Sequence, residues 1–131
     1  MRLLLDTHTF LWWAFDQPQL SAQAAQALRE PSNEVFFSAV TALEIAIKNR
    51  LGRDNVIHLD GDPADLVPLW VAEYGFITLP VEVSHALRVA ALPPIHGDPF
   101  DRLLVAQAQI EGLTILTADP AIAQYGVPVA W

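Results

Sequence analysis

The sequence contains no cysteine among its 131 residues. This absence excludes disulfide bonds, thiolate metal sites and cysteine nucleophiles, and it fits a reducing compartment. Long apolar runs are also missing, so no segment reaches the ~20 residues of a membrane-spanning helix. The first residues, MRLLLDTHTFLWW, carry Asp6 and His8 where a signal peptide needs an unbroken apolar segment. These features predict a soluble, cytoplasmic protein.

Positive charge is scarce. The chain has 7 Lys and Arg against 15 Asp and Glu, which gives a net charge of −8. Such a charge opposes binding of a polyanion by bulk electrostatics, so a nucleic-acid function would need cations or a basic partner. The apolar content of 53% excludes a disordered chain. It also suggests that a partner covers some apolar surface.

Short apolar segments alternate with helical patterns along the chain. We expect strands at 2–6, 35–38, 76–80 and 113–117, and helices at 7–15, 21–30, 41–50, 64–75, 83–92 and 99–111. Ser21 caps the second helix and Gly52 stops the third, whereas 56–59 is either an extra strand or a loop. Several strands lack outward polar positions, which is typical of a parallel sheet covered on both faces. The prediction is a single α/β domain over residues 1–131, with three α/β/α layers around a mostly parallel sheet.

Four acids follow strand ends or lie in the helices after them. Asp6 comes directly after the first strand, and Asp119 comes just past the strand at 113–117. If these two strands are neighbours, the two acids face one another at one edge of the sheet. Glu44 lies in the helix after the second strand, and Asp101 lies in the first turn of the helix at 99–111. One crevice beyond the carboxyl ends of the strands could therefore collect all four.

Each acid also has a purely structural explanation. In the stretch Asp98-Pro99-Phe100-Asp101, Asp98 fits the N-cap and Pro99 the first helical position. Asp119-Pro120 invites the same interpretation, and Glu44 with Lys48 fits an exposed ion pair one helical turn apart. Asp6 is the hardest to explain in this way, because an acid that ends a buried strand loses its hydration. A divalent ion such as Mg²⁺ or Mn²⁺ would remove the repulsion within a carboxylate cluster.

The segments LLLDTHTFLWW, ALEIAIK, HGDPFDRLLVAQA and LTILTAD, in this order, resemble the PIN-domain family, in particular the VapC-type toxin ribonucleases of toxin–antitoxin pairs. The resemblance spans nearly the whole chain. It implies a PIN-like fold in which Asp6, Glu44, Asp101 and Asp119 hold one or two Mg²⁺ or Mn²⁺ ions. The implied reaction is endonucleolytic hydrolysis of an RNA phosphodiester by metal-activated water.

The resemblance also implies partners and supporting residues. The expected partners are RNA, a cognate VapB-like antitoxin that occupies the site groove, and a second copy of the chain in a homodimer. Thr7 matches the hydroxyl residue that follows the first acid, and Asp98 is a cap or a neighbour of the metal ligands. Thr117 is expected to hydrogen-bond near the acids. Candidates for holding the RNA backbone are Arg102, Lys48 and Arg50.

The histidines and tryptophans receive structural interpretations. His8 departs from the family, where a small polar residue is common, and its role stays open. His58, His85 and His96 lack the spacing of metal ligands, although His96 lies near the expected site. Trp12 and Trp13 could stack on bases, but their neighbours favour a core or partner interface.

Two other functions compete with the nuclease. A phosphoryl-transfer enzyme could use Asp6 as its nucleophile, but that pattern needs a second Asp at the position of His8. A non-catalytic PIN-like module could bind RNA or an antitoxin without cutting. The presence of all four acids argues against this alternative.

Overall fold

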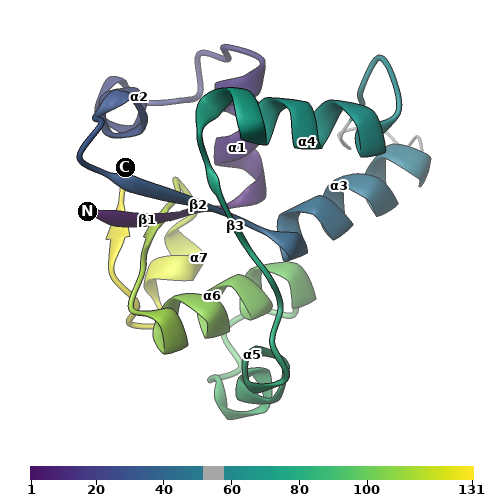
Figure 1. Cartoon of the computed structure of the whole chain (residues 1–131). Helices are drawn as coiled ribbons and strands as arrows, with labels where there is room; N and C mark the ends of the chain where they lie inside the picture. The colour runs from purple at the N-terminus through teal and green to yellow at the C-terminus, as the bar shows by residue number, and fades with distance from the viewer. Residues whose placement is uncertain (52–57) are drawn as a thin grey trace.

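The sheet runs through the centre of the molecule, which a computed structural model describes for residues 1–51 and 58–131 (Figure 1). Within these residues, five strands form one sheet in the order β3-β2-β1-β4-β5, and every neighbouring pair is parallel. The strands are β1 (Arg2–Leu5), β2 (Glu34–Ser38), β3 (Ile77–Leu79), β4 (Thr114–Leu116) and β5 (Val129–Ala130). The parallel sheet expected from the apolar runs is confirmed.

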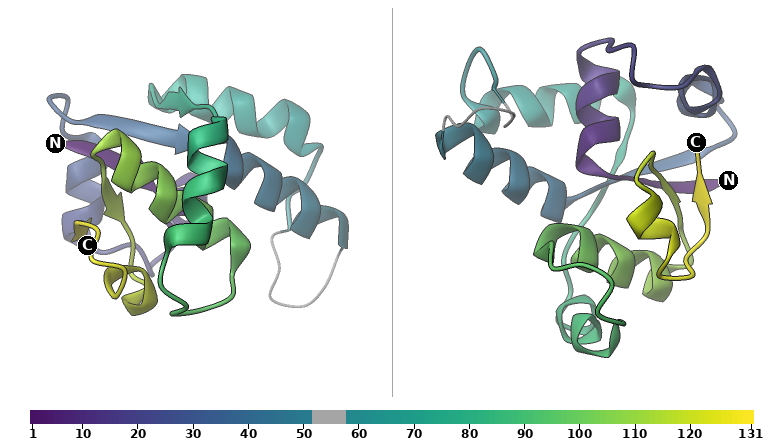
Figure 2. Two further views of the ribbon diagram at one scale, coloured as in Figure 1. Left: turned by 90° about the horizontal axis from the view of Figure 1, so that it is seen from below. Right: turned by 180° about the vertical axis from the view of Figure 1, so that it is seen from behind.

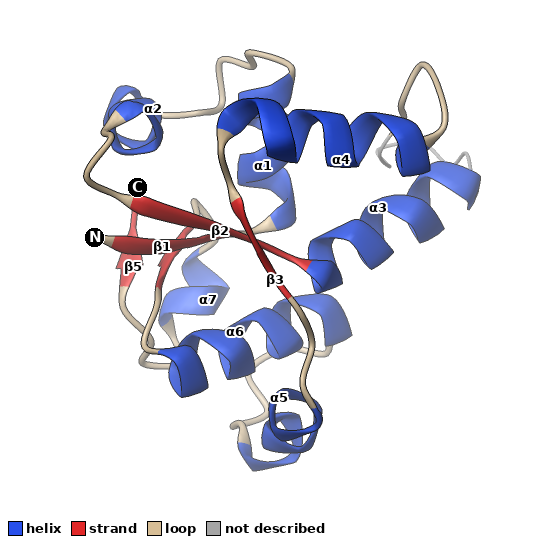
Figure 3. Cartoon of the chain, in the orientation of Figure 1, coloured by secondary structure: helices blue, strands red, loops and turns tan. Residues whose placement is uncertain are grey.

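Both faces of the sheet are covered, because successive residues of a strand point to opposite sides. Leu3 and Leu5 of β1 pack into one apolar cluster, whereas Leu4 between them packs into the other. Figure 3 shows α1 (Thr7–Ala14), α2 (Ala22–Arg29) and α4 (Pro63–Tyr74) on one side of the sheet. On the other side lie α6 (Pro99–Glu111) and α7 (Pro120–Ala123). The predicted three-layer architecture is confirmed.

Strand register brings distant segments to one edge. Leu5 of β1 is level with Leu116 of β4, so Asp6 and Thr117 leave the sheet side by side. On the other side of β1, strand β2 passes without a loop into α3 (Ala39–Leu51), which starts two residues before the predicted position 41. The two views in Figure 2 show that α3, α6 and α7 gather around this carboxyl edge.

The expected helix at 83–92 is shorter and changes type. It consists of α5 (Val83–Arg88) followed by one 3₁₀ turn, η1 (Val89–Ala91). Leu92 is extended because a residue before proline avoids the helical region, and Pro93 follows it. The expected helix stop at Gly52 and the first half of the segment 56–59 lie outside the described residues, and residues 58–59 are not in a strand.

Pro68 lies inside α4, which begins at Pro63 with Asp62 as its N-cap. Near the C-terminus, Val129–Ala130 form the short edge strand β5. Among the described residues, no helix combines the length and apolar character needed to cross a bilayer.

Candidate active site

Asp6 lies between β1 and α1 at the carboxyl edge and is 5% exposed. Its carboxylate caps α1 by accepting a hydrogen bond from the Thr9 backbone N–H at 2.8 Å. The second carboxylate oxygen accepts the Thr117 hydroxyl at 2.5 Å. The Thr117 oxygen in turn accepts the backbone N–H of Asp119 at 3.0 Å. Thr117 therefore connects the acid after β1 with the acid after β4.

Burial raises the pKa of Asp6 above its ordinary value, although the hydrogen bonds from Thr117 and Thr9 act in the opposite direction. The donors around this carboxylate thus do not compensate for its lost hydration. A cation beside Asp6 would supply the missing stabilisation of its charged form.

Glu44 lies on α3 and is 3% exposed. Its carboxylate accepts the Thr7 hydroxyl at 2.5 Å and forms an ion pair with Lys48. The ion pair suggested by the sequence is present, but its carboxylate is buried, so the interpretation of an exposed surface pair is wrong. Because Thr7 directly follows Asp6, the start of α1 holds the first two acids of the site together.

Asp98 and Asp101 have different positions at the start of α6, where Asp98 is the N-cap and Asp101 lies in the first turn. Asp98 is the N-cap and accepts the backbone N–H groups of Phe100 at 2.9 Å and Asp101 at 3.1 Å, as predicted. Burial is the main reason that the pKa of Asp101 is raised to about 6, followed by the negative charge of Asp98. The charges of Glu44 and Asp6 raise the pKa of Asp101 further. The carboxylates of Asp6, just after β1, and Glu44, on α3, therefore lie close enough to Asp101 on α6 to act on it.

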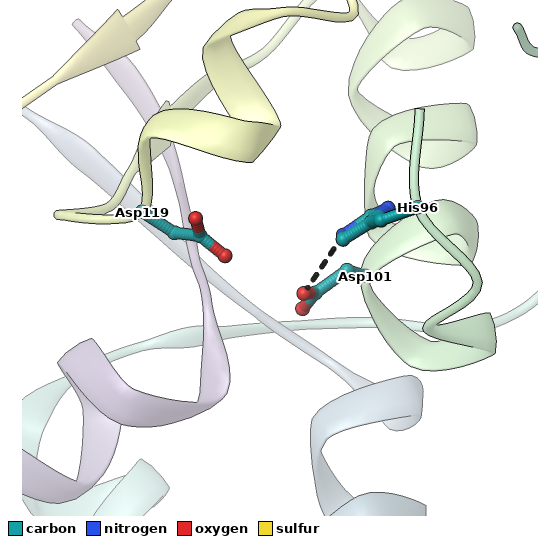
Figure 4. A group of neighbouring side chains, drawn as sticks. All are labelled: His96, Asp101 and Asp119. Carbon is teal, nitrogen blue, oxygen red and sulfur yellow. Dashed lines mark hydrogen bonds and ion pairs between the residues drawn. The ribbon is translucent and has the colours of Figure 1, made fainter. Parts of the chain in front are cut away.

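Asp119 completes the arrangement from the opposite side. It caps α7 through the Ala121 backbone N–H at 2.9 Å. Figure 4 shows Asp119 facing Asp101 and His96. Ligand atoms of these three residues lie within 4.8 Å of one another.

The sequence interpretation of His96 is structural, and the structure places its ring at the acidic cluster. Its Nε2 lies 3.3 Å from Oδ2 of Asp101, inside the acidic cluster. The spacing of residues along the chain does not indicate that His96 lies in this cluster, because the other members of the cluster come from separate elements. The available signal was its position in the loop directly before the Asp98 cap.

Tyr125 is a second residue that sequence reasoning missed. Its hydroxyl lies 2.6 Å from Nδ1 of His96 and 3.2 Å from Nη1 of Arg102. The Arg102 guanidinium also donates to four backbone carbonyls, that of Val89 in η1 and those of Leu92, Pro93 and His96 in the loop before α6. In this structure the donors of Arg102 hold that loop.

The remaining sequence candidates lie near the site or away from it. His8 is exposed on α1, and its ring lies 5.6 Å from the ring of Trp12. Trp13 packs against the core, as one of the two sequence interpretations had it. His85 is fully buried and contacts Glu111 at 2.8 Å, which fits the structural role expected for it.

The donor set fits a divalent cation. Carboxylate oxygens are the ligands that Mg²⁺ and Mn²⁺ prefer, and an imidazole nitrogen is acceptable to Mn²⁺. Two of the carboxyl groups, Asp6 and Asp101, have raised pKa values caused mainly by burial. Desolvated acids at one edge of a parallel sheet are the chemistry that a bound ion would stabilise.

A parallel three-layer fold with carboxylates gathered at the carboxyl edge defines a class of metal-site α/β proteins. The PIN domain family model matches residues 3–128, so this chain belongs to the PIN domain family. Ribonuclease VapC22 of Mycobacterium tuberculosis is 31% identical over 129 residues, which cover 96% of this chain and 93% of that protein. The resemblance to VapC-type proteins is confirmed.

Solved structures share the fold at low sequence identity. VapBC2 from Rickettsia felis, bound to a promoter DNA fragment, has a TM-score of 0.73 at 11% identity, with 99% of this chain and 98% of that chain covered. VapBC-1 from nontypeable Haemophilus influenzae gives 0.64 at 15% identity, covering 99% and 97%. FitAcB from Neisseria gonorrhoeae gives 0.61 at 21% identity, covering 97% and 95%.

Proposed function

We propose that this protein is a metal-dependent endoribonuclease toxin that acts in the cytoplasm and is neutralised by a VapB-like antitoxin. The observation that carries the proposal is the convergence of Asp6, Glu44, Asp101 and Asp119 at one sheet edge, where the charges of Asp6 and Glu44 reach Asp101. We propose RNA as the substrate because the similar protein from Mycobacterium tuberculosis is named a ribonuclease. We propose an antitoxin partner because solved structures with the same fold are VapBC complexes.

In this proposal Asp6, Glu44, Asp101 and Asp119 hold Mg²⁺ or Mn²⁺. A bound ion of this kind supplies an activated water and offsets charge on the scissile phosphate. Thr117 fixes the orientation of the Asp6 carboxylate through its hydroxyl, and Thr7 does the same for Glu44. The cation also explains how a chain with a net charge of −8 can receive a polyanion.

The antitoxin has a suitable surface on the far side of α3. A cavity of about 1050 Å³ lies between α3 and α4 and is lined mainly by apolar side chains. Ala42 and Ala46, four residues apart, line it, whereas Glu44 between them contacts Thr7 in the acidic site. We assign this groove to an apolar segment of the antitoxin. Filling it would cover apolar surface on the face of α3 opposite Glu44.

A homodimer has a second apolar surface available. Val83 and Leu87 of α5 are 76% and 71% exposed, and Ile110 of α6 is 40% exposed. Hydrogen bonding between Arg88 and Gln109 holds α5 against the same end of α6. Burial of this face against a second copy would remove apolar side chains from water. A Leu87→Glu variant should therefore shift the protein toward monomer in analytical ultracentrifugation.

The direct test is incubation of the purified protein with several structured and single-stranded RNAs, with Mn²⁺, with Mg²⁺ or with EDTA. Cleavage should require a metal ion, and Asp6→Asn should abolish it. The matched control is Asp65→Asn, which changes an exposed acid in the first turn of α4. Cleavage in EDTA, or equal cleavage by Asp6→Asn, would contradict the proposed mechanism.

Growth of a host cell separates the nuclease from a non-catalytic binding module. Expression of the protein without a partner should arrest growth, and Asp101→Asn should relieve the arrest at the same protein level. Normal growth with abundant intact protein would favour the binding module.

A further inference from the structure

We propose that His96 is a direct ligand of the divalent ion through Nε2, next to Asp101 and Asp119, and that Tyr125 and Arg102 hold its ring for this purpose. The inference rests on the metal site of the proposed function and adds a nitrogen ligand to it.

Distances among the three side chains agree with shared coordination. Neighbouring ligands of an octahedral ion with bonds of about 2.1 Å lie roughly 3 Å apart, and opposite ligands lie roughly 4.2 Å apart. Nε2 of His96 lies 3.3 Å from Oδ2 of Asp101. Ligand atoms of His96, Asp101 and Asp119 all lie within 4.8 Å of one another (Figure 4). Closure around an ion thus needs only small side-chain movements.

The other ring nitrogen is held by the protein. Nδ1 of His96 lies 2.6 Å from the hydroxyl of Tyr125, a residue that is 7% exposed. Histidine ligands of metals nearly always have this second nitrogen in a hydrogen bond that fixes the tautomer and the ring plane. Arg102 donates to the Tyr125 oxygen at 3.2 Å, which leaves that oxygen a second lone pair to accept the Nδ1 proton. A bound ion would select that tautomer and replace the hydrogen bond between His96 and Asp101, so that the Nε2 lone pair would face the ion.

Arg102 also fixes the loop from which His96 projects. Its guanidinium nitrogens contact the carbonyl oxygens of Val89, Leu92 and Pro93 at 3.1, 3.3 and 2.8 Å. Since Arg102 directly follows Asp101 on α6, one helix turn positions both a carboxylate ligand and the support of the imidazole ligand. The ring is therefore placed before metal binding, and little conformational entropy remains to be lost.

A nitrogen ligand has a consequence for metal choice. Mg²⁺ prefers oxygen ligands and retains several waters, whereas Mn²⁺ accepts imidazole. The site should thus favour Mn²⁺ over Mg²⁺ more than a site of carboxylates alone would. Loss of the imidazole should weaken Mn²⁺ binding more than Mg²⁺ binding.

Pulsed EPR of the full-length protein loaded with Mn²⁺ tests the ligand directly. Wild-type protein should show the hyperfine coupling of a directly bound imidazole nitrogen, and His96→Gln should lose it. His8→Gln is the matched control, because it removes an exposed imidazole two residues from Asp6. A wild-type spectrum without nitrogen coupling would overturn the proposal, as would coupling that persists in His96→Gln.

Isothermal titration calorimetry separates a ligand from a residue that only positions Asp101. We expect His96→Gln to weaken Mn²⁺ binding at least about 10-fold and Mg²⁺ binding about 3-fold or less. Tyr125→Phe, which keeps the ring packing, should weaken Mn²⁺ binding roughly 10-fold. Equal losses for both ions in His96→Gln would assign His96 a positioning role and overturn direct coordination.

The two proposals fail in different ways. Nitrogen coupling in a protein that cuts no RNA would leave the ligand assignment intact and contradict the proposed nuclease. Metal-dependent cleavage without nitrogen coupling would support the nuclease and overturn the assignment of His96.

Discussion

The two halves of the acidic edge are built differently. In the half formed by α1 and α3, Asp6 and Glu44 are 5% and 3% exposed, and each accepts a hydrogen bond from a threonine hydroxyl. In the half formed by α6 and α7, Asp101 and Asp119 are only partly buried. Each lies at the start of a helix that begins with proline, Asp101 in the first turn of α6 and Asp119 as the N-cap of α7.

This difference separates a fixed half from an open half. Asp6 cannot change its rotamer without breaking the hydrogen bonds from Thr9 and Thr117. Asp101 and Asp119 face His96 across a space where only one contact, between His96 and Asp101, is formed. In the proposed site, the fixed half would set where the ion is held, and the open half would adapt to the ion and to the substrate.

The largest expected effect is that of removing charge from the fixed half. Asp6→Asn should lower RNA cleavage at least about 100-fold, because it would weaken the hold on the ion that offsets negative charge in the transition state. The same change should raise the thermal stability of the metal-free protein at pH 7.5, because a desolvated carboxylate is replaced by a neutral amide. Cleavage rates and calorimetric melting in EDTA measure both effects. A variant that is inactive and also less stable would indicate a damaged fold.

The pH dependence of stability reports the uncompensated charge. The pKa of Asp101 in the folded protein is raised to about 6. The stability that protonated Asp101 gives the folded protein is therefore fully present below about pH 4 and is lost as the pH rises through 6. Denaturant unfolding in EDTA should show wild type losing about 2 kcal/mol relative to Asp101→Asn between pH 4 and pH 7.5, a figure reduced for solvent screening. Mn²⁺ should remove most of this loss. A constant difference between the two proteins would show that Asp101 carries no unfavourable charge.

Charge removal in the open half should separate activity from stability. Asp119→Asn should lower cleavage about 10-fold, while its stability should stay within about 0.5 kcal/mol of wild type because asparagine is an equally good N-cap. Kinetics together with chemical denaturation measure the split. A clear loss of stability would mean that Asp119 does more than cap α7 and face the site.

The smallest effect is expected from the hydroxyl that links the halves. Thr117→Val keeps the side-chain shape but removes the donor to Asp6, which should cost about 1 kcal/mol of stability and a several-fold loss of cleavage. Thr114→Val is the matched control, because Thr114 starts β4 level with Leu3, at the end of the strand away from Asp6. Equal stability and equal RNA cleavage in the two variants would show that the Thr117 hydroxyl has no role in the site.

Sequence patterns were sufficient for the fold and the acidic edge for a physical reason. Apolar runs such as Leu3 to Leu5 define buried parallel strands, and such strands bring the residues after them to one edge. The sequence alone therefore predicts that Asp6 and Asp119 lie close together. The same logic gave the caps at Asp98 and Asp119, because capping is encoded within three residues of sequence.

The rest depended on tertiary contacts that leave no local pattern. His96 reaches the site from a loop that Arg102 and Tyr125 hold, and Tyr125 is 29 residues away in the chain. The burial of Glu44 likewise comes from packing of α3 beside α1, since its Lys48 spacing is the same in an exposed pair. The division of 83–92 into α5 and η1 follows from the proline after Leu92.

The central claim is that the fixed and open halves hold one divalent ion between them. Crystals soaked in Mn²⁺, with anomalous differences measured near the manganese edge, test it most directly. We predict an anomalous peak within about 2.5 Å of carboxylate oxygens of Asp101 and Asp119, on the side that faces Asp6. A fully soaked crystal with no peak there, or with manganese bound only elsewhere, would contradict the account.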